Sequence, residues 1–103
     1  MPEFSRNRVN VESDLFDLVP VLKESLSAEL CEIITGLQEG DFALIREKVH
    51  SAKGAALTFG FGVYADELVN LRQAALDCDD IRIQQSIDRL NLLLETSVFV
   101  PAG

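Results

Sequence analysis

Apolar residues recur along this chain at helical spacing in four successive stretches. In the first, between about residues 20 and 38, they are Leu22, Leu26, Leu30, Ile33 and Leu37. In the second they are Phe42, Ile45, Val49, Ala52, Ala56 and Phe59. In the third and fourth they are Tyr64, Leu68, Leu71 and Ala75, then Ile83, Ile87, Leu90 and Leu94. Intervals of three and four residues put these side chains on one helix face, so the pattern predicts four amphipathic helices.

The residues between these stretches are typical of helix ends. Asp41 is a good N-cap for the second helix, and Asp79 or Asp80 is a good N-cap for the last one. Gly60 follows the second stretch, and glycine commonly ends a helix. No proline occurs in the stretch 21–98, so nothing there forbids long helices.

The N-terminal residues follow a different pattern. The polar stretch 6–10 is expected to fray, and we interpret residues 1–12 as a flexible segment preceding a domain at 13–99. Ser13 or Asp14 can cap a short helix before the first long one. Strand signals are weak throughout, because the chain shows no sustained alternation of apolar and polar residues.

The four long helices are expected to pack on one another. Each apolar stripe has to be buried, and short connections make consecutive helices antiparallel neighbours. The last helix should end near Phe99, and the short N-terminal helix should cover one end of the core. The predicted fold class is all-α, an antiparallel four-helix bundle with one short additional helix.

The charge balance limits the possible partners. The chain has 103 residues, enough for one domain, with 9 Lys and Arg against 17 Asp and Glu and a net charge of −8. Phosphate binding needs a surplus of basic residues, which argues against nucleic acid or an anionic membrane as the main partner. No apolar run approaches the roughly 18 residues of a membrane span, and no secretory signal is visible. We therefore expect a cytoplasmic protein.

Cysteine and histidine content limits metal and disulfide chemistry. Cys31 and Cys78 are isolated within helical patterns, and we interpret them as small buried hydrophobic residues in a reducing compartment. Together with a single histidine they are too few for a structural zinc site, which needs about four such ligands.

The single histidine, His50, is the candidate for chemistry. At about 100° per residue it points roughly 130° away from the apolar stripe of its helix, so the imidazole should face solvent. Lys53 and Gly54 follow three and four residues later and are its neighbours on the helix surface. A glycine inside a helix costs about 1 kcal/mol relative to alanine. Because Gly54 lies nearly opposite the stripe, the space beside it suits an external protein. The simpler interpretations are a surface histidine without a role, a solvated lysine and a glycine that allows close helix packing.

The run from His50 to Gly60 resembles the H-x-x-K-G-x5-G signature of histidine-containing phosphotransfer (HPt) domains, the carrier modules of two-component phosphorelays. The preceding Gly40-Asp41 also resembles the family pattern, and the likeness extends loosely over residues 15–94. Chance coincidence of these four residues at set offsets is expected about once in several thousand histidines at average composition.

This resemblance implies a fold, a reaction and partners. HPt domains are up-down-up-down four-helix bundles. By likeness, Nε2 of His50 accepts a phosphoryl group from the aspartyl phosphate of a receiver domain, or from a sensor histidine kinase, and passes it to another receiver. Lys53 would steady the phosphoryl group, and Gly54 would leave room for the receiver. The Mg²⁺ belongs to the receiver, so the chain would need no cofactor or metal and would be a carrier without kinase activity of its own.

A docking surface around the histidine follows from helix geometry. Ala43, Leu57 and Phe61 project near its direction, with Arg46 and Glu47 on the flanks. We favour an exposed partner-binding role for Leu57. Phe61 has two open interpretations, a place in the same exposed patch or an inward turn at the start of the next helix.

One position departs from the family pattern. Some HPt domains have a glutamine on the next helix that orients the histidine ring, and here Arg72 takes that position, with Gln73 beside it. Arg72 either contacts the phosphoryl group or is a solvated helix charge.

Two other functions stay open at this point. We expect a monomeric relay carrier. The first alternative is a helical interaction module without chemistry. The same signature also occurs in the phosphoacceptor domain of chemotaxis-type kinases, although Met1 makes a free-standing protein more natural.

Overall fold

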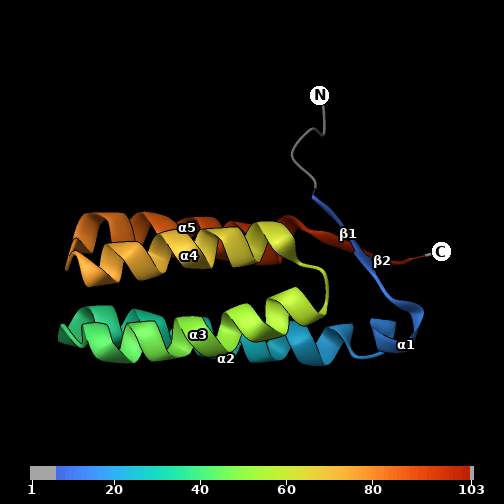
Figure 1. The fold of residues 1–103 in the computed structure, drawn as a ribbon, viewed down its shortest axis with the longest axis horizontal. Coiled ribbons are helices and arrows are strands. Elements are labelled where there is room, and N and C mark those ends of the chain that lie inside the picture. The colour runs from blue at the N-terminus through green and yellow to red at the C-terminus, as the bar shows by residue number, and fades with distance from the viewer. Residues whose placement is uncertain (1–6, 103) are drawn as a thin grey trace.

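The structure, a computed structural model, describes residues 7–102, and its helices are those that the apolar stripes indicate. The elements in chain order are β1 (Arg8–Val11), α1 (Ser13–Phe16), α2 (Val19–Glu39), α3 (Phe42–Thr58), α4 (Gly62–Leu76), α5 (Asp80–Thr96) and β2 (Val98–Pro101). Figure 1 shows the four long helices side by side, with both strands beyond one end of them. The prediction of a predominantly helical protein is confirmed.

The expected stripes form the core. In the described part of the chain, α3 packs against α2 and α4, and α5 also packs against α2 and α4. Leu26, Ile45, Leu68 and Leu90, one from each long helix, are fully buried. The burial of these stripes is the main favourable contribution to folding, at about 25 cal/mol for each Å² of apolar surface removed from water.

Side-chain capping sets the start of two long helices as predicted. Oδ1 of Asp41 accepts a hydrogen bond from the Leu44 backbone N–H at 3.0 Å. Oδ1 of Asp79 likewise accepts from the Arg82 N–H at 3.1 Å, so Asp79 rather than Asp80 is the cap. Gly60 follows α3 with φ at 77°, a left-handed conformation that glycine adopts without a steric penalty.

Two predicted helix boundaries near the chain ends were wrong. Glu12 is the N-cap of α1 and makes no side-chain capping bond, so neither Ser13 nor Asp14 caps this helix. The Ser13 hydroxyl instead donates to the Ala102 carbonyl at 3.3 Å. The last helix ends at Thr96 rather than near Phe99, because the chain continues as a strand.

The expectation of no strands was also wrong. Strands β1 and β2 form a two-stranded parallel sheet in which Val9 pairs with Phe99 and Val11 with Pro101. Val9 and Val11 are 3% and 0% exposed, so residues 8–10 are held in the fold rather than frayed. Residues 1–6 of the expected flexible segment lie outside the described residues. The pairing joins segments about 90 residues apart, and a local pattern does not register such a contact.

The cysteines depart from expectation too. Cys31 and Cys78 are both free and exposed, not buried. Cys31 lies on the outer face of α2, beside the buried Leu30. Cys78 lies in the turn between α4 and α5 with φ at 51°. Among residues 7–102, no helix combines the length and apolar character that crossing a membrane requires.

Candidate functional site

Helix α3 presents His50 to solvent. Ile45, Val49 and Ala52 on the same helix are buried, whereas His50 is exposed. Burial of the stripe fixes the rotation of α3, and this rotation leaves the imidazole on the outside. The predicted outward orientation of His50 is confirmed.

A shallow hollow of about 220 Å³ lies beside the histidine. It is lined by His50, Lys53, Gly54 and Leu57, all from α3. All four were expected at this site from the sequence, and the structure brings them together on one helix face. The hollow combines a potential nucleophile, a cation, bare backbone and an apolar side chain.

Gly54 faces open space. A Cβ placed there would meet no heavy atom within 4 Å, apart from its own helix backbone. The glycine therefore does not serve close packing of α3 against another described helix. Gly36 in α2 shows the contrasting case, because a Cβ there would lie 2.9 Å from Cγ1 of Ile45. The interpretation of Gly54 as a packing glycine is excluded for the described residues.

The expected docking residues divide into surface and core. Leu57 is 56% exposed, and Ala43 and Glu47 are exposed as well, whereas Arg46 is half-buried. Phe61 is 0% exposed, so its assignment to the docking surface was wrong.

Phe61 turns inward because its ring packs against two other aromatic side chains. Its ring stacks on Tyr64 with centroids 4.9 Å apart and meets Phe99 edge-on at 5.0 Å. Offset and edge-to-face pairs of this kind add stabilisation beyond the area that they bury. Of the two interpretations that the sequence left open, the inward turn is the one that the structure contains.

Two polar contacts that were not predicted from the sequence connect α3 to α2 next to the site. Nζ of Lys48 forms an ion pair with Oε1 of Glu32 at 3.0 Å, and the Ser51 hydroxyl donates to Oε2 of Glu29. The hydrogen bond and the charge of Glu32 raise the pKa of the Lys48 ammonium above its ordinary value. The signal was a matching spacing on two helices that are neighbours in the chain: Glu29 and Glu32 are three residues apart on α2, and Lys48 and Ser51 are three residues apart on α3.

Arg72 and Gln73 are both exposed on α4. Nε2 of Gln73 donates to Oδ1 of Asp77, the C-cap residue of α4, at 3.2 Å. No hydrogen bond or ion pair within residues 7–102 links Arg72 or Gln73 to His50.

The arrangement offers a nucleophile and a cation to a molecule outside the chain. The hollow is open, and no three His, Cys, Asp or Glu side chains in the described part of the chain are grouped as metal ligands. An exposed imidazole can attack an electrophile held by another protein, and the adjacent ammonium can pair with an anion formed there. Comparison of the chain with protein-family models, with curated proteins and with solved structures found no match.

Proposed function

We propose that this protein is a phosphohistidine carrier of the HPt type. The observation that carries the proposal is the exposed His50 on α3 beside a Gly54 that has no neighbour to accommodate. A glycine that weakens its helix and serves no internal packing indicates that another molecule uses the space. The H-x-x-K-G-x5-G spacing of His50, Lys53, Gly54 and Gly60 supports the same function.

The proposed fold is an antiparallel up-down-up-down four-helix bundle. The closed ring of contacts from α2 to α3, α4, α5 and back to α2 supports this arrangement. The connections between successive helices are short, which favours antiparallel neighbours. In such a bundle the outer face of α3 is free along its length, and a receiver domain has direct access to it.

The proposed reaction moves a phosphoryl group between an aspartate and His50. The Nε2 lone pair of a neutral imidazole attacks the phosphorus of an aspartyl phosphate on a receiver domain. The N–P bond forms as the P–O bond to the aspartate breaks, and the aspartate leaves as a carboxylate. Mg²⁺ held by the receiver would offset the phosphoryl charge, and in-line positioning of His50 against the aspartyl phosphate would add to the rate enhancement. The Lys53 ammonium pairs with the phosphoryl oxygens on the carrier.

The proposed partners are receiver domains of response regulators, a sensor histidine kinase, or both. We propose a monomeric, cytoplasmic carrier that needs no metal or cofactor of its own. A phosphoacceptor domain of a chemotaxis-type kinase would use the same residues, and the donor distinguishes the two settings.

Substitution of His50 tests the function. His50→Gln removes the nucleophile and keeps a polar surface residue, so we expect an intact helical circular dichroism spectrum and complete loss of phosphoryl acceptance. The assay measures transfer of radiolabel from a set of phosphorylated receivers. Wild-type phosphate should be acid-labile and base-stable. The matched control is Gln85→Ala on the exposed side of α5, which should accept label at the wild-type rate.

Two results would contradict the proposal. Label on the His50→Gln variant would place the phosphoryl group elsewhere. Binding of a receiver to wild-type protein without any transfer would favour the alternative function, an interaction module without chemistry.

A further inference from the structure

A second cavity lies at the end of the helices where the two strands meet. It is an open pocket lined by residues of α1, the first turns of α2 and the start of β2, and it has a volume of about 540 Å³. This volume is within the range of small-molecule binding sites in proteins. No residue of α3 lines the cavity, so it is separate from the hollow beside His50.

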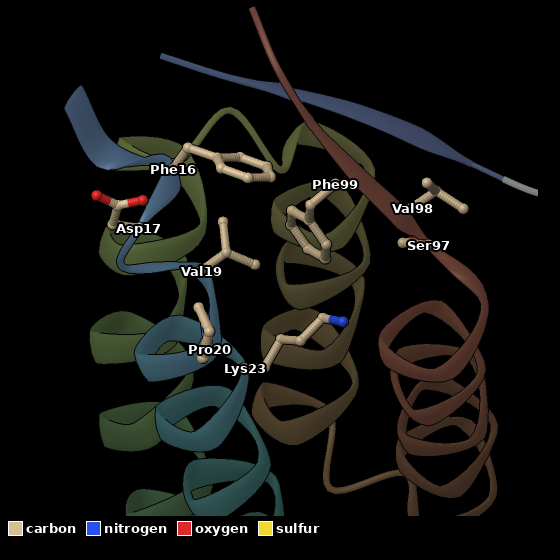
Figure 2. Close-up of a pocket in the computed structure, with 8 residues that line it drawn as sticks. All are labelled: Phe16, Asp17, Val19, Pro20, Lys23, Ser97, Val98 and Phe99. Atoms are coloured by element: carbon tan, nitrogen blue, oxygen red, sulfur yellow. The ribbon is translucent and has the colours of Figure 1, made fainter. Parts of the chain in front are cut away.

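The walls of this cavity are mainly apolar. Phe16 comes from α1, Val19 and Pro20 come from α2, and Phe99 comes from β2. Figure 2 shows the side chains of Phe16, Val19 and Phe99 directed toward a common space. Such walls favour an alkyl or aryl group and offer it few hydrogen bonds.

One cation lies at the edge of this apolar space. Nζ of Lys23 is 5.2 Å from the centroid of the Phe99 ring, a cation–π contact that directs the ammonium over the cavity. Within residues 7–102, no carboxylate forms an ion pair with Lys23. Asp17 is the other charged residue at the cavity, and in Figure 2 its carboxylate points away from the space between the rings. An ammonium keeps donors free for an incoming anion while it contacts an aromatic face.

We propose that this cavity binds a small carboxylic acid with an apolar alkyl or aryl body. The carboxylate pairs with Lys23, and the body lies between Phe16 and Phe99. The Lys23 ammonium, which has no ion-pair partner within residues 7–102, favours an acid over an amine although the chain carries a net charge of −8, and the aromatic walls favour an apolar body over a sugar or a nucleotide. The inference does not depend on the proposed function, since the two sites share no residue.

Titration with octanoate tests this proposal, with 1-octanol as the uncharged probe of the same length. Amide resonances of the wild-type protein are followed by NMR. We expect saturable shifts at Phe16, Val19, Lys23 and Phe99 and none at His50. Lys23→Gln should weaken octanoate binding about threefold to fivefold at low salt, as expected for a solvated charge pair, and leave octanol binding unchanged. The matched control Lys53→Gln removes a lysine of α3 and should bind octanoate like the wild type.

Three outcomes would overturn the proposal. The first is no saturable shift with octanoate at the cavity residues. The second is equal octanoate affinity of the wild type and Lys23→Gln. The third is a set of shifts centred on another surface. Added salt should reduce the difference between octanoate and octanol, because it screens an exposed charge pair.

Discussion

Gly36 and Gly54 both lie inside long helices, but their surroundings are opposite. Beyond the Ile45 side chain, a Cβ on Gly36 would meet the Asp41 carbonyl oxygen at 3.2 Å, whereas a Cβ on Gly54 would meet nothing. The sequence places Gly54 nearly opposite the apolar stripe of its helix, but it does not show which side chains lie beside either glycine. Their different roles depend on what the neighbouring helix places beside each one.

The same substitution at these two glycines is expected to change stability in opposite directions. Gly54→Ala should raise the free energy of unfolding by about 1 kcal/mol through helix propensity alone. Gly36→Ala should lower it by about 1–3 kcal/mol, because the added methyl group overpacks the contact with Ile45. Urea denaturation followed by circular dichroism measures both variants. Equal effects at the two positions would contradict the packing difference.

A long side chain at Gly54 tests access to the histidine. Gly54→Lys should leave the protein folded, because the space there is open, and it should slow phosphoryl transfer from a receiver by an order of magnitude or more. The same receiver assay measures it, with Gly54→Ala as the matched small substitution. A wild-type transfer rate for Gly54→Lys would mean that the partner does not approach over this glycine.

The charge of Lys53 is tested separately. Lys53→Ala should lower transfer to the carrier about tenfold, or shorten the lifetime of the phosphorylated form, through loss of a charge-assisted contact worth about 1.5–3 kcal/mol at full strength. Single-turnover transfer and the decay of label are the measurements. If neither changes, the lysine is a solvated surface residue.

The elements were predictable where local signals specify them. Apolar periodicity marked the four long helices, and Asp41 and Asp79 marked two of their starts. The sheet was not predictable, because each strand is four residues long and gains its stability from a partner at the other end of the chain. A two-stranded sheet alone is marginal in water, so this one depends on packing against the helices.

That packing is visible at the connection between α3 and α4. A Cβ on Gly60 would lie 3.0 Å from the Asn10 carbonyl oxygen, so β1 passes close to this turn. Val9 and Val11 point into the core on either side of Asn10, which is exposed. The strand therefore closes the end of the core next to Phe61.

Alanine substitution along β1 tests this contribution. Val11→Ala should lower the free energy of unfolding by about 2 kcal/mol through lost burial and the remaining cavity. Asn10→Ala is the matched control and should change stability by less than about 0.5 kcal/mol, since the side chain is exposed. Urea denaturation measures both. A frayed N-terminal segment would give no difference between the two variants.

At the scale of the whole molecule, a buried tyrosine in the core is expected to lower the free energy of unfolding at alkaline pH. Burial raises the pKa of the Tyr64 phenol above its ordinary value of 10, and the nearby Glu29 carboxylate adds to the effect. Above about pH 10 the unfolded chain releases this proton and the folded protein retains it. The unfolded state is then favoured, and this group lowers the free energy of unfolding by up to about 1.4 kcal/mol per pH unit.

Tyr64→Phe is expected to remove this contribution. The variant should have near wild-type stability at neutral pH and a shallower loss of stability above pH 10. Thermal unfolding between pH 8 and 11 measures the difference. Other groups that titrate in this range, Lys48 among them, are common to both proteins and cancel in the comparison. Parallel pH profiles would show that the phenol is accessible to water in the folded protein.

The sequence by itself determined the helices, their buried faces and the outward direction of His50. These follow from a period of 3.6 residues, because the rotation of a helix is set once one face is buried. It also placed Lys53, Gly54 and Leu57 beside the histidine, since residues three, four and seven apart share a helix face.

The tertiary structure alone decided the remaining features. The inward turn of Phe61, the pairing of β1 with β2 and the cavity beneath Phe99 all depend on side chains brought together from distant parts of the chain. A local pattern carries the periodicity of one element. It does not carry the contacts between elements, and these contacts decide which apolar residues are covered and which spaces stay open.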